Sequence, residues 1–115
     1  MATFEDREKS YEAKWAHDED VRFRTLARRN KLLGLWAAAE MGLSGAAAES
    51  YAHDLLDLEV KGGRDEDLAQ KIRTDFDARN IALSDHVIRL KMEELLVEAR
   101  EQVMRETKKG SSGSD

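Results

Sequence analysis

Four residues between positions 28 and 36 carry side chains that could bind a nucleotide. Arg28, Arg29 and Lys31 could hold phosphate groups, and Trp36 could stack on a purine base. The chain has no glycine-rich phosphate loop of the common nucleotide-binding folds. We therefore expect these cations to pair with acidic side chains or to stay solvated, and we keep a site for ADP or ATP as the alternative.

A second group, Glu49, His53 and Asp57, is spaced four residues apart and would share one face of a helix. Carboxylate and imidazole groups can ligate zinc, but a fourth protein ligand is not evident. The chain contains no cysteine, which excludes disulfides, thiolate metal sites and cysteine nucleophiles. The serines have no companion that would activate a nucleophile. We expect no enzyme activity, no metal site and no cofactor.

The segment FEDREKSYEAKWAHDED, residues 4–20, places three aromatic rings among charged side chains. On a helix, Phe4, Tyr11 and Trp15 would lie within about 40° of each other. An isolated helix of this length is marginal in water. We therefore predict that residues 1–17 form a mobile arm, which becomes helical when a partner supplies an apolar groove. The alternative is that the arm folds back and covers the chain's own helices.

The rest of the chain is expected to be helical, because alanine, leucine, glutamate and arginine dominate and proline is absent. Residues typical of helix ends mark the boundaries. These are Asp18 to Asp20 and Gly42 around the first helix, Ser44 and Gly62-Gly63 around the second, Asp65 and Asn80 around the third, and Ser84 before the last. The short connections favour antiparallel neighbours.

The expected core consists of apolar residues that recur every three to four positions. They are Leu26, Leu33, Ala37 and Met41; Ala48, Tyr51, Ala52, Leu55 and Leu56; Leu68, Ile72 and Phe76; and Val87 or Ile88, Met92, Leu95, Leu96, Ala99 and Val103. The predicted fold class is all-α. A four-helix bundle-like domain covers residues 18–108, with a flexible N-terminal arm and a disordered polar tail at residues 109–115.

Charge is distributed in blocks along the chain, whose net charge is −5. Residues 1–20 carry seven acids and three bases, residues 21–36 five bases and no acid, and residues 37–60 five acids and no base. Such blocks favour solvated helix faces that pair with neighbours, or a basic stripe that docks on an acidic partner. The acidic balance argues against nucleic acid as the main partner. No apolar run is long enough to span a membrane and no signal peptide is visible, so we expect a cytoplasmic protein.

The arm followed by ARRNKLLGLWAA resembles the zeta subunit of the F-type ATP synthase of alphaproteobacteria. The resemblance continues through GLSG at residues 42–45 and, more loosely, along DEDLAQKIRTDFDA to about residue 105. Tyr11 and Trp15 stand where family members often have phenylalanine, so the arm keeps its aromatic character. The tail after Thr107 matches nothing in the family.

The resemblance implies a four-helix domain that inhibits ATP hydrolysis. In the family, the arm enters a catalytic interface between the alpha and beta subunits, against the gamma shaft, and blocks rotation in the hydrolysis direction. Carried over to this chain, the residues that bind the partner would be Phe4, Arg7, Glu8, Tyr11, Lys14 and Trp15. The protein would then be peripheral to the inner membrane through the synthase, without inserting into it.

Overall fold

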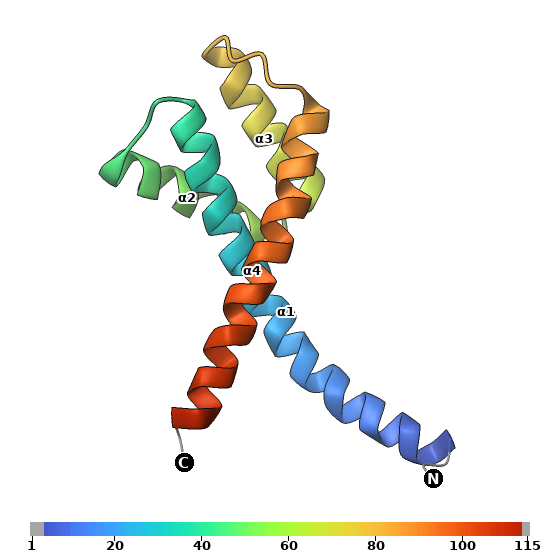
Figure 1. The fold of residues 1–115 in the computed structure, drawn as a ribbon. Helices are drawn as coiled ribbons and strands as arrows, with labels where there is room; N and C mark the ends of the chain where they lie inside the picture. The colour runs from blue at the N-terminus through green and yellow to red at the C-terminus, as the bar shows by residue number, and fades with distance from the viewer. Residues whose placement is uncertain (1–3, 114–115) are drawn as a thin grey trace.

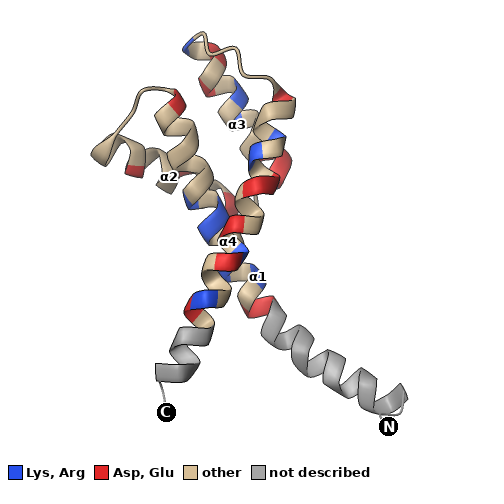
Figure 2. Cartoon of the chain, viewed as in Figure 1, with Lys and Arg blue, Asp and Glu red and all other residues tan. Residues whose placement is uncertain are grey.

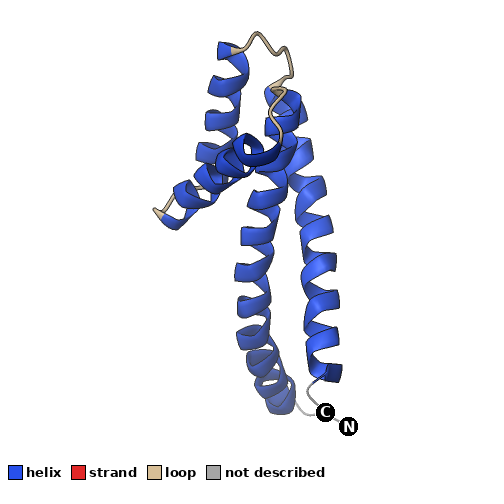
Figure 3. Ribbon diagram, turned by 90° about the vertical axis from the view of Figure 1, so that its left-hand side faces the viewer, coloured by secondary structure: helices blue, strands red, loops and turns tan. Residues whose placement is uncertain are grey.

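Four α-helices joined by short turns make up the part of the chain that the structure describes (Figures 1 and 3). The computed structural model describes the backbone of residues 4–113 and the side chains of residues 19–107. The helices are α1 (Phe4–Glu40), α2 (Gly45–Val60), α3 (Asp65–Ala78) and α4 (Asp85–Gly113). The predicted all-α class with four helices is confirmed.

The ends of α1 and α3 lie where the sequence predicts them. After α1, Gly42 has a φ of +78°, and after α3, Asn80 has a φ of +57°. Residues with a Cβ rarely adopt this left-handed conformation, and glycine and asparagine are the types that tolerate it at helix ends. These two residues therefore stop the helices and redirect the chain.

The N-terminal caps match the prediction in part. The Ser84 hydroxyl oxygen accepts a hydrogen bond from the Val87 N–H at 3.2 Å, as expected for a cap of α4. Ser44 occupies the cap position of α2 but makes no side-chain cap bond. The expected cap at Asp65 is wrong by one residue, because Arg64 takes this position and its backbone N–H donates to Asp67 Oδ2 at 2.8 Å.

The outer ends of α1 and α4 extend beyond their expected limits. The expected start of the first helix near residues 18–20 is wrong, since α1 begins at Phe4. Neither proline nor glycine interrupts residues 4–33, and adding residues to an existing helix costs far less than starting one. Helix α4 continues to Gly113, past the expected end near residue 108. The assignments of a mobile arm and a disordered tail stay predictions.

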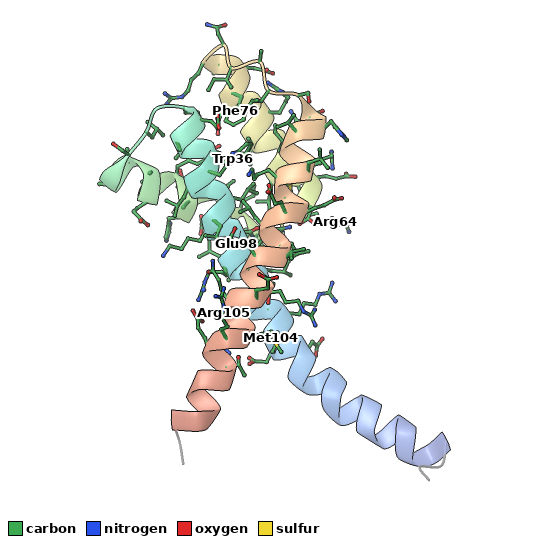
Figure 4. The ribbon with its side chains drawn as sticks, in the orientation of Figure 1. Trp36, Arg64, Phe76, Glu98, Met104 and Arg105 are labelled. Atoms are coloured by element: carbon green, nitrogen blue, oxygen red, sulfur yellow. The ribbon has the colours of Figure 1, made fainter. Side chains whose placement is uncertain are left out.

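Helix α1 is central in the packing, because both α2 and α4 lie against it and α3 packs on α4 and α2 (Figure 1). The rings of Trp36 on α1 and Phe76 on α3 meet edge to face, with centroids 5.8 Å apart (Figure 4). Most of the predicted core residues are buried. Leu96 is an exception at 37% exposure, because it lies at the edge of the α4 stripe rather than within it.

Helices α1 and α2 come very close together at Gly34. A Cβ built on this residue would lie 2.4 Å from Ala52 Cα and 2.9 Å from Ala52 Cβ. Real Cβ atoms do not approach other carbons this closely, so glycine at position 34 lets α2 lie almost directly on the backbone of α1. This contact fixes the position of α2 against the middle of the buried part of α1.

Candidate interaction site

The six residues predicted to bind a partner, Phe4, Arg7, Glu8, Tyr11, Lys14 and Trp15, have side chains outside the described residues. Their backbone belongs to α1, which runs without a break into the packed part of the molecule. Within the described side chains, the densest polar arrangement lies further along the same helix. It starts in residues 21–36, the basic block of the sequence, where α1 meets α4 (Figure 2).

Arg28 is held by the C-terminal part of α4. Its guanidinium donates to Gln102 Oε1 at 2.8 Å and forms an ion pair with Glu106 at 2.7 Å. Arg24 joins the same carboxylate at 3.7 Å and donates to Thr107 Oγ1 at 3.1 Å. The five side chains are all at least partly exposed, so each pair contributes little to stability, but together they fix how α4 lies on α1.

Arg29 and Asn30 form a buried network that joins α1 to α2 and α3. Arg29 is 2% exposed, and its guanidinium donates to Asp65 Oδ1 and to Asn30 Oδ1, both at 2.7 Å. Asn30 is fully buried and its amide nitrogen donates to Glu59 near the end of α2. Two adjacent residues of α1 therefore hold the end of one helix and the start of the next.

Burial shifts the proton affinity of one member of this network. The pKa of Glu59 is raised, chiefly because burial disfavours its charged form. The Arg29 charge and the Asn30 hydrogen bond act in the opposite direction without cancelling the burial effect. Glu59 is therefore easier to protonate in the folded chain than in the unfolded chain.

The four residues considered for a nucleotide do not form one site, although Arg28 and Lys31 line the same surface pocket. Arg28 and Arg29 point to different neighbours, as described above, and Trp36 packs on Phe76 with Lys91 Nζ 5.8 Å from its ring centre. Lys31 is exposed on α1. The hydrogen bonds and ion pairs match the expectation of pairing arginines, and a nucleotide site made of this set stays a prediction.

A surface pocket with a volume of about 610 Å³ lies between α1 and α2. Basic side chains from α1 line one wall, with Glu49 and His53 of α2 on the other. Phe23 borders the pocket and is 73% exposed, which is unusual for a large aromatic ring. Bases within residues 21–36 therefore face this pocket as well as the contacts with α4.

A smaller pocket of about 460 Å³ lies on the other side of α1, against α4. Three arginines line it, Arg22, Arg29 and Arg100, together with Thr25. Thr25 is 5% exposed, and its hydroxyl has no hydrogen-bond partner among the described residues. A buried hydroxyl without a hydrogen-bond partner costs about 1–3 kcal/mol, so threonine is an unfavourable residue at position 25.

The spaced acids and histidine of α2 do not assemble a metal site. Asp57 pairs with Lys61 Nζ at 2.9 Å, and this hydrogen bond lowers the Asp57 pKa. In the region with described side chains, no three histidine or acidic groups lie close enough to hold a metal ion. Among the described helices, none combines the length and apolar character needed to cross a membrane.

These features define a small all-α protein. Its other helices pack around one long helix, α1, and polar contacts between the helices fix their arrangement. The chain belongs to the ATPase inhibitor subunit zeta family, whose model matches residues 1–102. This confirms the resemblance seen in the sequence, and the matched range includes the N-terminal segment.

A protein solved by solution NMR is also similar. It is 35% identical to this chain and superimposes with a TM-score of 0.64. The match covers 74% of this chain and 96% of the other. No curated protein matches this chain. The four-helix arrangement is therefore shared with a solved relative at a level of identity that supports a common fold.

Proposed function

We propose that this chain inhibits ATP hydrolysis by the ATP synthase by inserting its N-terminal segment into a catalytic interface. The segment, residues 1–17, would enter as a helix between the alpha and beta subunits, against the gamma shaft. A helix wedged in an interface that must close prevents the catalytic cycle from completing. The observation that carries the proposal is the match to an ATPase inhibitor family over residues 1–102, which includes this segment.

The helical backbone from Phe4 onward supports insertion in this form. If fully covered by the partner, Phe4, Tyr11 and Trp15 would each contribute of order 1.5–3 kcal/mol. Ordering the segment offsets part of this gain, so affinity should depend on a few dominant side chains. The charges of Arg7, Glu8 and Lys14 would set register and encounter rate more than affinity. A regulatory rather than catalytic role follows from this proposal.

The test is an ATPase assay with the cognate synthase head and increasing amounts of the full chain. Replacing Tyr11 and Trp15 together with alanine should raise the concentration for half inhibition at least tenfold, equivalent to about 1.4 kcal/mol. Val60→Ala is the matched control, because Val60 is 73% exposed on α2 and outside the segment. Inhibition by the double variant at the parent's concentration would rule out the anchoring role.

A second assay removes residues 1–17. The shortened chain should keep the helical circular dichroism and cooperative melting of residues 18–108 and should no longer inhibit. Loss of folding would instead favour the alternative that the segment covers its own helices.

Nucleotide binding is the competing function, and the described contacts give it less support. Arg28 and Arg29 are engaged by Glu106 and Asp65, and the Trp36 ring is packed on Phe76. Titration of ADP into the ¹⁵N-labelled chain, followed by NMR at two salt concentrations, tests nucleotide binding directly. Saturable changes in the amide chemical shifts of Arg28, Arg29 and Trp36 would establish a sensor role beside inhibition.

A further inference from the structure

We propose that the pocket between α1 and α4 binds a small anion with an aliphatic body, such as a medium-chain carboxylate. Its volume of about 460 Å³ lies within the usual range for small-molecule sites. Aliphatic side chains from both helices line it, namely Val21, Leu26, Leu96 and Val97. Leu96 and Val97 are 37% and 60% exposed, so an apolar ligand would cover surface that now faces water.

The charge around this pocket selects for an anion. Arg22, Arg29 and Arg100 contribute three positive charges, whereas Asp65 is the only acidic residue of the lining. Asp65 is already paired with Arg29 at 2.7 Å. Arg22 and Arg100 form no ion pair with any residue between 19 and 107. A guanidinium donates two parallel hydrogen bonds to a carboxylate, which makes these two arginines suitable ligands for one.

The buried hydroxyl of Thr25 is an independent sign of a ligand. Thr25 lines the pocket from α1, and its Oγ1 is shielded from solvent without a hydrogen-bond partner among the described residues. Buried polar groups in native proteins are nearly always paired, and a bound water, ion or ligand is one explanation for an exception. A ligand oxygen in the pocket would supply the missing partner.

The lining also distinguishes this ligand from a nucleotide. No aromatic side chain lines the pocket, so a base would have no ring on which to stack. Of the four residues considered for ADP or ATP, only Arg29 lies here. The apolar part of the ligand is therefore aliphatic.

The direct test is a titration of the full, ¹⁵N-labelled chain with octanoate at constant ionic strength. We expect saturable shifts at the amides of Thr25, Leu26, Leu96 and Val97, with a Kd in the millimolar range. Acetate keeps the charge without the apolar body, and octylammonium keeps the body with the opposite charge, so each should bind at least tenfold more weakly. Equal binding of either, or tighter binding of ADP at the same amides, would overturn the proposal.

Two variants connect the binding to named side chains. Arg100→Gln should weaken octanoate binding at least fivefold, because it removes one of the pocket's two guanidinium groups that have no ion pair among residues 19–107. Arg100 is exposed, so this substitution should not disturb the core. Arg105→Gln is the control, since Arg105 does not line the pocket and lies nearer the C-terminal end of the same helix (Figure 4). Thr25→Val should weaken binding while leaving the melting temperature unchanged or higher. Unchanged affinity in both pocket variants would show that octanoate binds elsewhere. These measurements read binding alone and do not depend on the proposed inhibition.

Discussion

Gly34 determines how closely α1 and α2 approach each other. The backbone of Ala52 occupies the place where a side chain at position 34 would start. Because the nearest atom is a backbone carbon rather than a flexible side-chain end, the two helices would have to move apart to accept even a methyl group. Position 34 therefore controls the packing of the whole α1–α2 interface.

Gly34→Ala should destabilise the protein by roughly 1–3 kcal/mol, the usual cost of overpacking. In an unpacked helix the same change would stabilise by up to about 1 kcal/mol, so the predicted sign is opposite to that of helix propensity. Urea unfolding followed by circular dichroism measures the difference. Glu40→Ala, at an exposed position of the same helix, is the control and should change stability little. A more stable Gly34→Ala variant would contradict the described spacing.

Glu59 should make stability depend on pH. Its pKa is raised in the folded chain, so the stabilising contribution of the protonated form is complete below the unfolded pKa of about 4.3. This contribution is lost as the pH rises through the raised folded value. Glu59→Gln keeps a neutral side chain at every pH, and its carbonyl can still accept the hydrogen bond from Asn30.

We therefore expect Glu59→Gln to be more stable than the parent at pH 7, with a difference that shrinks toward pH 4. Thermal melting of both proteins across this pH range is the measurement. Glu49→Gln, on the exposed side of the same helix, serves as the control. A Glu59→Gln variant that is less stable at pH 7 would mean that the Arg29 charge outweighs burial.

The helices are positioned by two neighbouring arginines with different roles. Arg28 reaches α4 through partly exposed partners, whereas Arg29 is buried and connects α1 to the first residue of α3. A pair in contact with water is weak, and the removal of a buried guanidinium leaves both a cavity and unpaired polar groups.

Arg29→Ala should thus destabilise the protein by roughly 2–3 kcal/mol, below the full cost of an orphaned buried charge because Asp65 stays in contact with water. Arg28→Ala should cost under about 1 kcal/mol. The two variants are matched controls for each other in one unfolding series. Equal losses would show that Arg29 gains nothing from its buried position.

The helix ends at the turns between helices could be predicted from the sequence to within about a residue. The start of α1 and the end of α4 could not. Gly42 and Asn80 carry local stop signals that act whatever the rest of the chain does. Near residue 18 the acids read as a helix start, but no residue there prevents a helix from continuing toward Phe4. An end without a stop signal depends on how far the packed helix propagates, which residue types alone do not determine.

The polar network of Arg29, Asn30 and Glu59 cannot be predicted from the sequence for a different reason. Asn30 lies between Leu26 and Leu33 in the apolar stripe of α1, and this position was a usable signal for burial. Its partner Glu59 comes from another helix, and sequence spacing does not show which charged residues meet in space. The family can be recognised from the sequence because its resemblance lies in neighbouring residues, such as Arg28 and Arg29, and does not depend on contacts between helices.

At the scale of the whole molecule, α1 is the element on which the others depend. Residues 29–38 of this helix contain five of its buried side chains, which face α2 on one side and α3 or α4 on others. Segments buried from several directions open only when the whole protein unfolds. Local opening of residues 29–38 should therefore require the full free energy of global unfolding.

Amide hydrogen exchange of the full chain should accordingly be slowest in residues 29–38. The protection there should equal the free energy of global unfolding measured with urea. Amides of α3, the shortest helix, should exchange faster through partial opening. Slower exchange in α3 than in α1 would place the most stable unit elsewhere.

The 37 residues of α1 give the helix a length of about 55 Å, so it can act as a mechanical lever. Once residues 1–17 are held as a helix by a partner, a load applied near Phe4 would be transmitted along α1 and resisted around Gly34, where α1 and α2 touch almost backbone to backbone. A joint of this kind yields very little, and torque delivered to the tip would be borne by the whole molecule.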